Sequence, residues 1–142
     1  MKSIKLIAAL LLSAIAFNAH AQKVIELNKE EFIEKVCDYT TQPLEWKYKG
    51  TLPCVIDFSA KWCGPCRRME PILEEMAEKY EGKIIIYKID VDKEYELSTI
   101  FGVKSIPAFL FCPASGEKPR GAKGAYPADE FEQFIITQLL SV

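Results

Sequence analysis

The chain has 142 residues, of which 49% are hydrophobic and 27% charged, and its formal net charge is −2 at pH 7. This length and apolar content suit one domain with a single hydrophobic core. The mildly acidic balance excludes the basic surface that proteins use to bind nucleic acid or anionic lipid, so we expect no nucleic-acid partner.

Residues 1–21 have the pattern of a secretory signal peptide. Two lysines lie near the start, residues 6–17 are apolar except for one serine, and Ala19-His20-Ala21 offers a small-x-small cleavage site. The apolar run is shorter than the roughly 20 residues that span a membrane. We therefore expect cleavage after Ala21, a mature single domain of residues 22–142 and no stable membrane association. The alternative is an uncleaved N-terminal anchor or a buried helix.

The first half of the mature chain predicts two strands and a helix. Residues 24–27 form a short strand candidate, and Asn28 can cap a helix. Residues 40–53 contain two prolines and a glycine and predict a loop. Residues 55–58 are apolar apart from Asp57, which is typical of a buried central strand. The apolar face of the predicted helix consists of Phe32, Ile33, Val36 and Cys37.

A longer helix is predicted after Cys66, followed by a strongly apolar strand. Gly82 ends this helix, and Pro71 is expected to kink it. Residues 84–91 are mostly β-branched and apolar, which favours a strand. A short helix is predicted around residues 95–101. The apolar face of the longer helix consists of Ile72, Leu73, Met76, Ala77 and Tyr80.

The C-terminal part predicts a hairpin and a closing helix. Residues 108–112 and 122–125 are the expected strands, joined by residues 113–116, and residues 129–140 have the pattern of an amphipathic helix. The element order is therefore β-α-β-α-β-α-β-β-α. This order predicts an α/β fold with a mixed, mostly parallel sheet, helices on both faces and an antiparallel hairpin at one edge.

The segment Trp62-Cys63-Gly64-Pro65-Cys66 lies where the central strand leads into the longer helix. Two cysteines separated by two residues can close and reopen a small disulfide ring. Unpaired backbone N–H groups and the macrodipole at a helix N-terminus favour a thiolate at Cys63. Pro65 suits the first helical turn because the N–H that it lacks would be unpaired there. The motif therefore predicts thiol–disulfide exchange.

Two other uses of a cysteine pair are a zinc site and a static disulfide. Zinc needs about four ligands, yet the motif occurs once and the only histidine, His20, lies in the segment expected to be cleaved. A static disulfide across so short a ring constrains little chain. We therefore expect no metal, and a mature chain without histidine also excludes Cys–His nucleophilic pairs.

With the cysteine pair so placed, the chain resembles the thioredoxin family over essentially its whole mature length. Asp57 stands where thioredoxins carry a buried carboxylate, and Lys88 where they carry its lysine neighbour. Ile106-Pro107 matches the isoleucine and cis-proline that face the active site, and Gly124 matches a glycine near the substrate groove. The resemblance implies a thioredoxin fold and needs no organic cofactor.

The resemblance also implies a role for each residue. Cys63 is the attacking nucleophile, and Cys66 is the resolving thiol. Their positions at the helix N-terminus and one turn inside it predict an exposed Cys63 and a shielded Cys66. Asp57 is a buried carboxylate with a raised pKa that accepts the proton of Cys66, and Lys88 modulates it. The alternatives are an Asp57 that points outward and a solvated Lys88. The expected substrate-binding residues are Trp62, Gly64, Pro65, Ile106, Pro107 and Gly124.

Gly64-Pro65 between the cysteines implies, by the same resemblance, the reducing end of the family. We therefore expect a monomeric periplasmic reductase of disulfides in exported proteins. No dissolved NADPH-linked reductase operates outside the cytosol. The expected partner that reduces the Cys63–Cys66 disulfide again is therefore a membrane electron-transfer protein. The alternatives are an oxidase or isomerase that uses the same cysteines, and a binding module that uses only the groove around Trp62, Ile106 and Pro107.

The chain departs from the family pattern in three respects. Residues 40–53 form a longer connection than expected, Ser59 stands where many thioredoxins have a tryptophan, and three further cysteines are present. Because Cys37, Cys54 and Cys112 fall on apolar faces, we expect them to be small core hydrophobes. The alternative is a Cys37–Cys54 bridge across the long loop, which an oxidising compartment permits.

Overall fold

The computed structural model describes residues 21–41 and 45–141, so the predicted signal peptide up to residue 20 lies outside the described residues. One sheet has the strand order β1-β3-β2-β4-β5. Strand β3 pairs in parallel with β1 and β2, whereas β4 pairs antiparallel with β2 and β5. The strands are β1 (Ile25–Glu26), β2 (Cys54–Ser59), β3 (Ile85–Asp90), β4 (Ala108–Cys112) and β5 (Arg120–Lys123).

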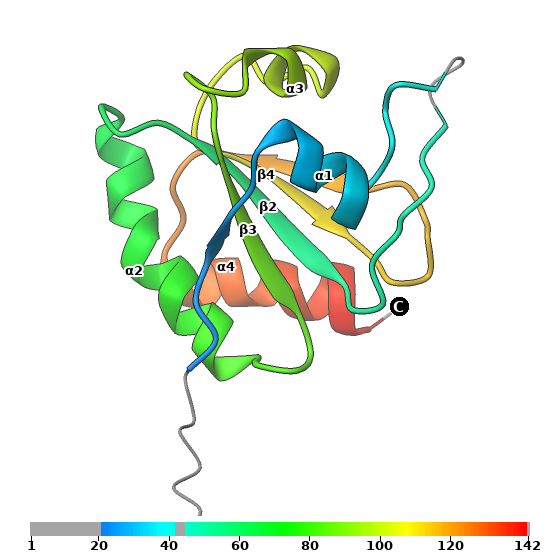
Figure 1. Cartoon of the computed structure of the whole chain (residues 1–142). Coiled ribbons are helices and arrows are strands. Elements are labelled where there is room, and N and C mark those ends of the chain that lie inside the picture. The colour runs from blue at the N-terminus through cyan, green and yellow to red at the C-terminus, as the bar shows by residue number, and fades with distance from the viewer. Residues whose placement is uncertain (1–20, 42–44, 142) are drawn as a thin grey trace, which may run out of the picture.

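Helices cover both faces of this sheet, as Figure 1 shows. Helices α1 and α3 pack on one face, and α2 and α4 pack on the other. Across residues 21–41 and 45–141, no helix combines the length and apolar character needed to cross a bilayer. The helices are α1 (Lys29–Lys35), α2 (Gly64–Lys79), α3 (Tyr95–Ile100) and α4 (Ala128–Ile135), which continues as a π-helical turn over Ile136–Leu140.

Strand β2 lies at the centre of the sheet and is buried along its whole length. Cys54, Ile56 and Phe58 join the core under α1 and α3. Val55 joins the core under α2 and α4. Because side chains alternate between the faces of a strand, Asp57 points to the same face as Val55, toward α2. The strand therefore places one carboxylate in an apolar layer and ends directly before the cysteine motif.

Local signals explain where two of the helices begin and end. The Asn28 side chain accepts a hydrogen bond from the Glu31 backbone N–H at 2.9 Å, and the Glu31 side chain accepts one from the Asn28 backbone N–H. This capping box satisfies two donors at the start of α1. Helix α3 is followed by Gly102, whose φ of +67° favours glycine. Both helix positions confirm the sequence-based prediction.

The second strand of the hairpin lies two residues earlier than predicted. Strand β5 covers Arg120–Lys123, not residues 122–125. It is an edge strand with mostly exposed side chains, so its sequence lacks the apolar alternation on which the prediction depended. Gly124, with a φ of +91°, ends it. The connection between β4 and β5 therefore covers residues 113–119, which include the predicted turn at 113–116.

The three additional cysteines are buried and unpaired. Cys37, Cys54 and Cys112 are each 0% exposed and carry free thiols, so the prediction that they are small core hydrophobes is confirmed. The alternative Cys37–Cys54 bridge is not formed. Cys54 instead lies opposite Cys112 in the β2–β4 pairing, and the two thiols pack in the same apolar layer.

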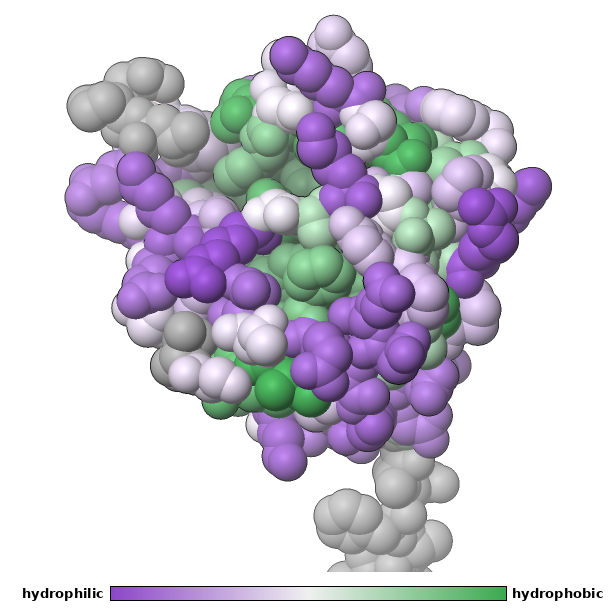
Figure 2. Space-filling model, turned by 180° about the vertical axis from the view of Figure 1, so that it is seen from behind, coloured by the Kyte–Doolittle hydropathy of each residue, from purple (hydrophilic) through white to green (hydrophobic). Residues whose placement is uncertain are grey.

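The face of the molecule seen in Figure 2 has hydrophobic areas between hydrophilic side chains. Among the described residues, five large hydrophobic side chains are exposed, and the two most exposed are Trp62 at 68% and Tyr95 at 77%. Exposed aromatic side chains commonly mark binding sites. Both residues line one groove beside the cysteine pair.

Candidate active site

The cysteine motif forms the junction between β2 and α2. Cys63 is the N-cap of α2, and its sulfur accepts a hydrogen bond from the Cys66 backbone N–H at 3.2 Å. Pro65 occupies the first turn. Cys63 and Cys66 form a disulfide, and their Cα atoms lie 5.2 Å apart. When the disulfide opens, the same N–H group and the helix dipole stabilise negative charge on the Cys63 sulfur.

Cys63 is less accessible than the sequence-based prediction assumed. It is 4% exposed, and Cys66 is 2% exposed. The prediction of an exposed Cys63 is therefore wrong for this oxidised form. The physical reason is the packing around the disulfide, because Ala60, Val91 and Ile106 lie against the two cysteines. A substrate thus meets a small sulfur surface framed by apolar groups.

The loop before β4 lies against the disulfide. The Ile106–Pro107 peptide bond is cis, as the resemblance implied. The Ile106 carbonyl oxygen lies 3.8 Å from the Cys63 sulfur. The Pro107 carbonyl accepts a hydrogen bond from the Gly124 N–H at 2.9 Å. The fold therefore brings Ile106 next to Cys63 and links the buried Pro107 to Gly124, so three of the predicted substrate-binding residues are close together.

Asp57 is a buried carboxylate on the α2 side of the sheet. It is 1% exposed, and its Oδ1 has no hydrogen-bond partner in the part of the chain that the structure describes. Burial raises the pKa of Asp57 to about 7, against the smaller opposing effect of the Lys88 charge. An acid with this pKa exchanges a proton readily at neutral pH. The alternative of an outward-pointing Asp57 is therefore wrong.

Lys88 lies beside Asp57 in the sheet, in register with it on the neighbouring strand. Its ammonium binds Glu70 of α2, with Nζ and Oε1 3.0 Å apart. Asp57, Glu70 and Lys88 line a cavity of about 460 Å³ between α2 and the β1 side of the sheet. The sequence-based reasoning found Asp57 and Lys88 but missed Glu70, because no motif marks a helix residue that reaches across to a strand.

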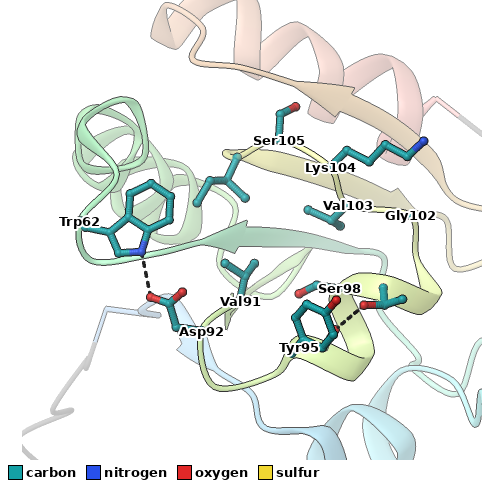
Figure 3. Close-up of a pocket in the computed structure, with 11 residues that line it drawn as sticks. Trp62, Val91, Asp92, Tyr95, Ser98, Gly102, Val103, Lys104 and Ser105 are labelled. Atoms are coloured by element: carbon teal, nitrogen blue, oxygen red, sulfur yellow. Dashed lines mark hydrogen bonds between the residues drawn. The ribbon is translucent and has the colours of Figure 1, made fainter.

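Figure 3 shows a groove of about 420 Å³ on the other side of the cysteine pair. The Trp62 indole N–H donates a hydrogen bond to Asp92 at 2.9 Å, which fixes the orientation of the exposed ring. Tyr95, in the first turn of α3, faces the same groove. Val91, Val103 and Ile106 complete its apolar lining.

The structure does not bring every predicted substrate-binding residue into the groove. Gly64 and Pro65 lie on the surface of the first turn of α2, half-buried and exposed respectively, and are not among the lining residues. Sequence reasoning missed Tyr95 and Asp92. The available signal was a large aromatic residue at the start of a short helix, where burial is not expected. Across the described residues, no group of three or more acidic, histidine or cysteine side chains is placed to hold a metal ion.

Sequence comparisons with known proteins identify the family. The Thioredoxin family profile matches residues 23–137. The chain is 45% identical over 111 residues to the thioredoxin of Borreliella burgdorferi, covering 78% of this chain and 93% of that protein. It is 31% identical over 118 residues to "Probable thioredoxin-2" of Caenorhabditis elegans, covering 82% and 73% respectively.

The likeness extends to solved structures. The crystal structure of chloroplastic thioredoxin z superposes with a TM-score of 0.66 at 25% identity, covering 81% of this chain and 93% of that one. The fold is thus supported by sequence and by structural comparison. This chain belongs to the thioredoxin family and is a thiol–disulfide oxidoreductase.

Proposed function

We propose that this thioredoxin is exported and reduces disulfides of other exported proteins through Cys63 and Cys66. The observation that carries the proposal is the position of this cysteine pair at the N-terminus of α2, between a buried carboxylate and an exposed aromatic groove. One side of the site offers a proton acceptor, and the other offers a surface for a protein substrate.

The proposed reaction transfers two electrons from the dithiol to the substrate. The Cys63 thiolate attacks one sulfur of the substrate disulfide, and the other substrate sulfur leaves as a thiolate and takes up a proton. Cys66 then gives its proton to Asp57 and attacks the Cys63 sulfur. The second substrate sulfur leaves, and Cys63 and Cys66 are left as a disulfide. Asp57 suits this step because it is buried, its Oδ1 has no hydrogen-bond partner among the described residues, and its pKa is raised to about 7.

Substrate segments are proposed to bind across the cis loop and the groove. Trp62 and Tyr95 offer exposed aromatic surface. The backbone beside Pro107 offers hydrogen-bonding groups to an extended segment, in the manner of an added strand. A loop of an exported protein that carries a strained or exposed disulfide has the shape and polarity that this surface requires.

The reducing direction is supported by Gly64-Pro65 between the cysteines. Equilibrating the purified mature protein against a dithiothreitol series is expected to give a reduction potential nearer the thioredoxin value of about −270 mV than the protein disulfide isomerase value of about −180 mV. Alkylation of free thiols followed by mass measurement reports the reduced fraction. A potential above about −180 mV contradicts the reductase and favours the oxidase or isomerase.

Export is supported by the charged, apolar and small-residue regions of residues 1–21. The mass of the protein isolated from the periplasm of its own cell is expected to correspond to a chain that begins at Gln22. A protein that keeps Met1 and sediments with membranes contradicts cleavage and identifies an anchor instead. Once exported, the disulfide needs electrons from outside its compartment, and we propose a membrane electron-transfer protein as the donor.

A further inference from the structure

The cavity beside Asp57 is lined by several charged side chains that have no role in the proposed reaction. Asp57 reaches it from β2, and on its other side the neighbouring β4 residue is the apolar Phe109. The remaining charged groups come from β1, β3 and α2. They are Glu26, Lys88, Glu70 and Glu74. Among the described residues that line this cavity, Lys88 is thus the one cation, and it faces three glutamates and the buried Asp57.

The contacts decide which carboxylate holds this cation. Lys88 Nζ lies 3.0 Å from Glu70 Oε1. Glu26 is engaged by Lys93, with Oε1 and Nζ 3.3 Å apart. Glu74 accepts a hydrogen bond from the Val24 backbone N–H at 3.3 Å. Glu70 is therefore the carboxylate that binds Lys88, while Asp57 Oδ1 has no partner among the described residues.

A lysine has one charge to share between its neighbours. An ammonium that is free beside a buried carboxylate stabilises the anion. When a second carboxylate binds the same ammonium, most of that stabilisation is lost, because the pair together has no net charge. The Glu70 side chain is half-exposed, so water weakens its direct repulsion of the Asp57 carboxylate. Glu70 therefore acts on Asp57 mainly by binding Lys88.

We propose that Glu70 is a positioning residue that binds Lys88, keeps that cation from compensating the Asp57 carboxylate, and so sets the pH range in which Asp57 takes the proton of Cys66. The inference rests on the proposed function, because it assigns a regulator to the same proton acceptor. The pKa of Asp57 is raised by burial, and Lys88 and Glu70 act on it in opposite directions, which agrees with this arrangement.

The test is a comparison of two neighbouring charge deletions. Glu70→Gln frees Lys88, so the pKa of Asp57 is expected to fall by about one unit, the scale for an opposite charge within a few ångströms. Glu74→Gln removes the same charge one turn further along α2 without touching Lys88, and its shift is expected to be much smaller. Carboxyl-carbon NMR of protein labelled at aspartate follows the titration directly, independently of activity.

A second comparison shows whether the effect passes through Lys88. In a Lys88→Ala background, Glu70→Gln is expected to shift Asp57 no more than Glu74→Gln does. A Glu70→Gln shift that is as small as the Glu74→Gln shift in the otherwise unchanged protein contradicts the inference. So does a large shift that persists without Lys88.

The kinetics separate this inference from the proposed function. The pH midpoint for resolution of the mixed disulfide is expected to move with the NMR midpoint in Glu70→Gln. If Asp57→Asn leaves the pH profile unchanged, the proposed role of Asp57 as proton acceptor is wrong, whatever Glu70 does. If Asp57→Asn changes the profile and Glu70→Gln moves neither midpoint, only the role of Glu70 is wrong.

Discussion

Replacing Cys66 with serine is expected to give a protein that attacks substrate disulfides and then stalls, joined to its substrate through Cys63. The reason is the division of labour along the first turn of α2. Cys63 is the N-cap, and its sulfur accepts a hydrogen bond from the Cys66 backbone N–H. Cys66 lies inside the turn and is buried. Cys63→Ser is expected to trap almost nothing. Turnover should fall by about a thousandfold or more in both variants, the scale seen when a catalytic nucleophile is removed.

The measurement uses each mature variant incubated with periplasmic extract, quenched with acid and separated on gels with and without reductant. Adducts that disappear with reductant are expected with Cys66→Ser alone, and mass spectrometry of them identifies the substrates. Adducts with Cys63→Ser alone reverse the two roles. If neither variant forms adducts and both keep full biological activity, the chain acts as a binding module.

The other thiols provide the necessary control. Cys37, Cys54 and Cys112 are each 0% exposed, so they are not expected to resolve a mixed disulfide in the folded protein. Repeating the trapping with alanine at these three positions tests this directly. If the Cys66→Ser adducts become more abundant in that background, one of the buried thiols had acted as a substitute resolving group.

The sequence predicted most of the fold because its strongest signals are local. Residues 84–91 are mostly β-branched and apolar, and β3 covers Ile85–Asp90. Asn28 and Glu31 form the capping box at the start of α1. The prediction was less accurate at β5, where Arg120–Lys123 is mostly exposed and no apolar alternation marks it. The bounds of this edge strand depend on its pairing with β4, and its own residues carry no apolar pattern that shows where the pairing begins and ends.

The site divides in the same way. The cysteine pair, Asp57 and the cis-proline were found because they belong to a recognisable pattern in the chain. Glu70 and Tyr95 were missed because their roles depend on tertiary structure. Glu70 binds a residue of a strand, and Tyr95 lines the same groove as the exposed Trp62. The low exposure of Cys63 was missed for a related reason, since Ile106 covers it from a loop 43 positions later in the chain.

Asp57→Asn is expected to make the protein more stable at alkaline pH and slower as an enzyme. The folded-state pKa of about 7 lies above the usual aspartate value of 3.8. Between these values the folded protein holds a proton that the unfolded chain has lost, so the free energy of unfolding falls as pH rises through this window. At about 1.4 kcal/mol per unit, the total loss above pH 7 is roughly 4 kcal/mol. Asparagine carries no charge and removes this loss.

The same substitution removes the proposed proton acceptor. Resolution of the mixed disulfide by Cys66 is therefore expected to slow by about a hundredfold or more near neutral pH, the scale of general base catalysis. The defect should shrink as pH rises, because hydroxide then takes the proton. Urea unfolding at about pH 5 and pH 8 measures the stability change, and stopped-flow fluorescence of Trp62 follows resolution. The contradicting result is a variant that is more stable at pH 8 yet resolves the mixed disulfide at an unchanged rate between about pH 6 and pH 9. That result would show that Asp57 affects stability alone, since loss of the proton acceptor for Cys66 must also slow resolution.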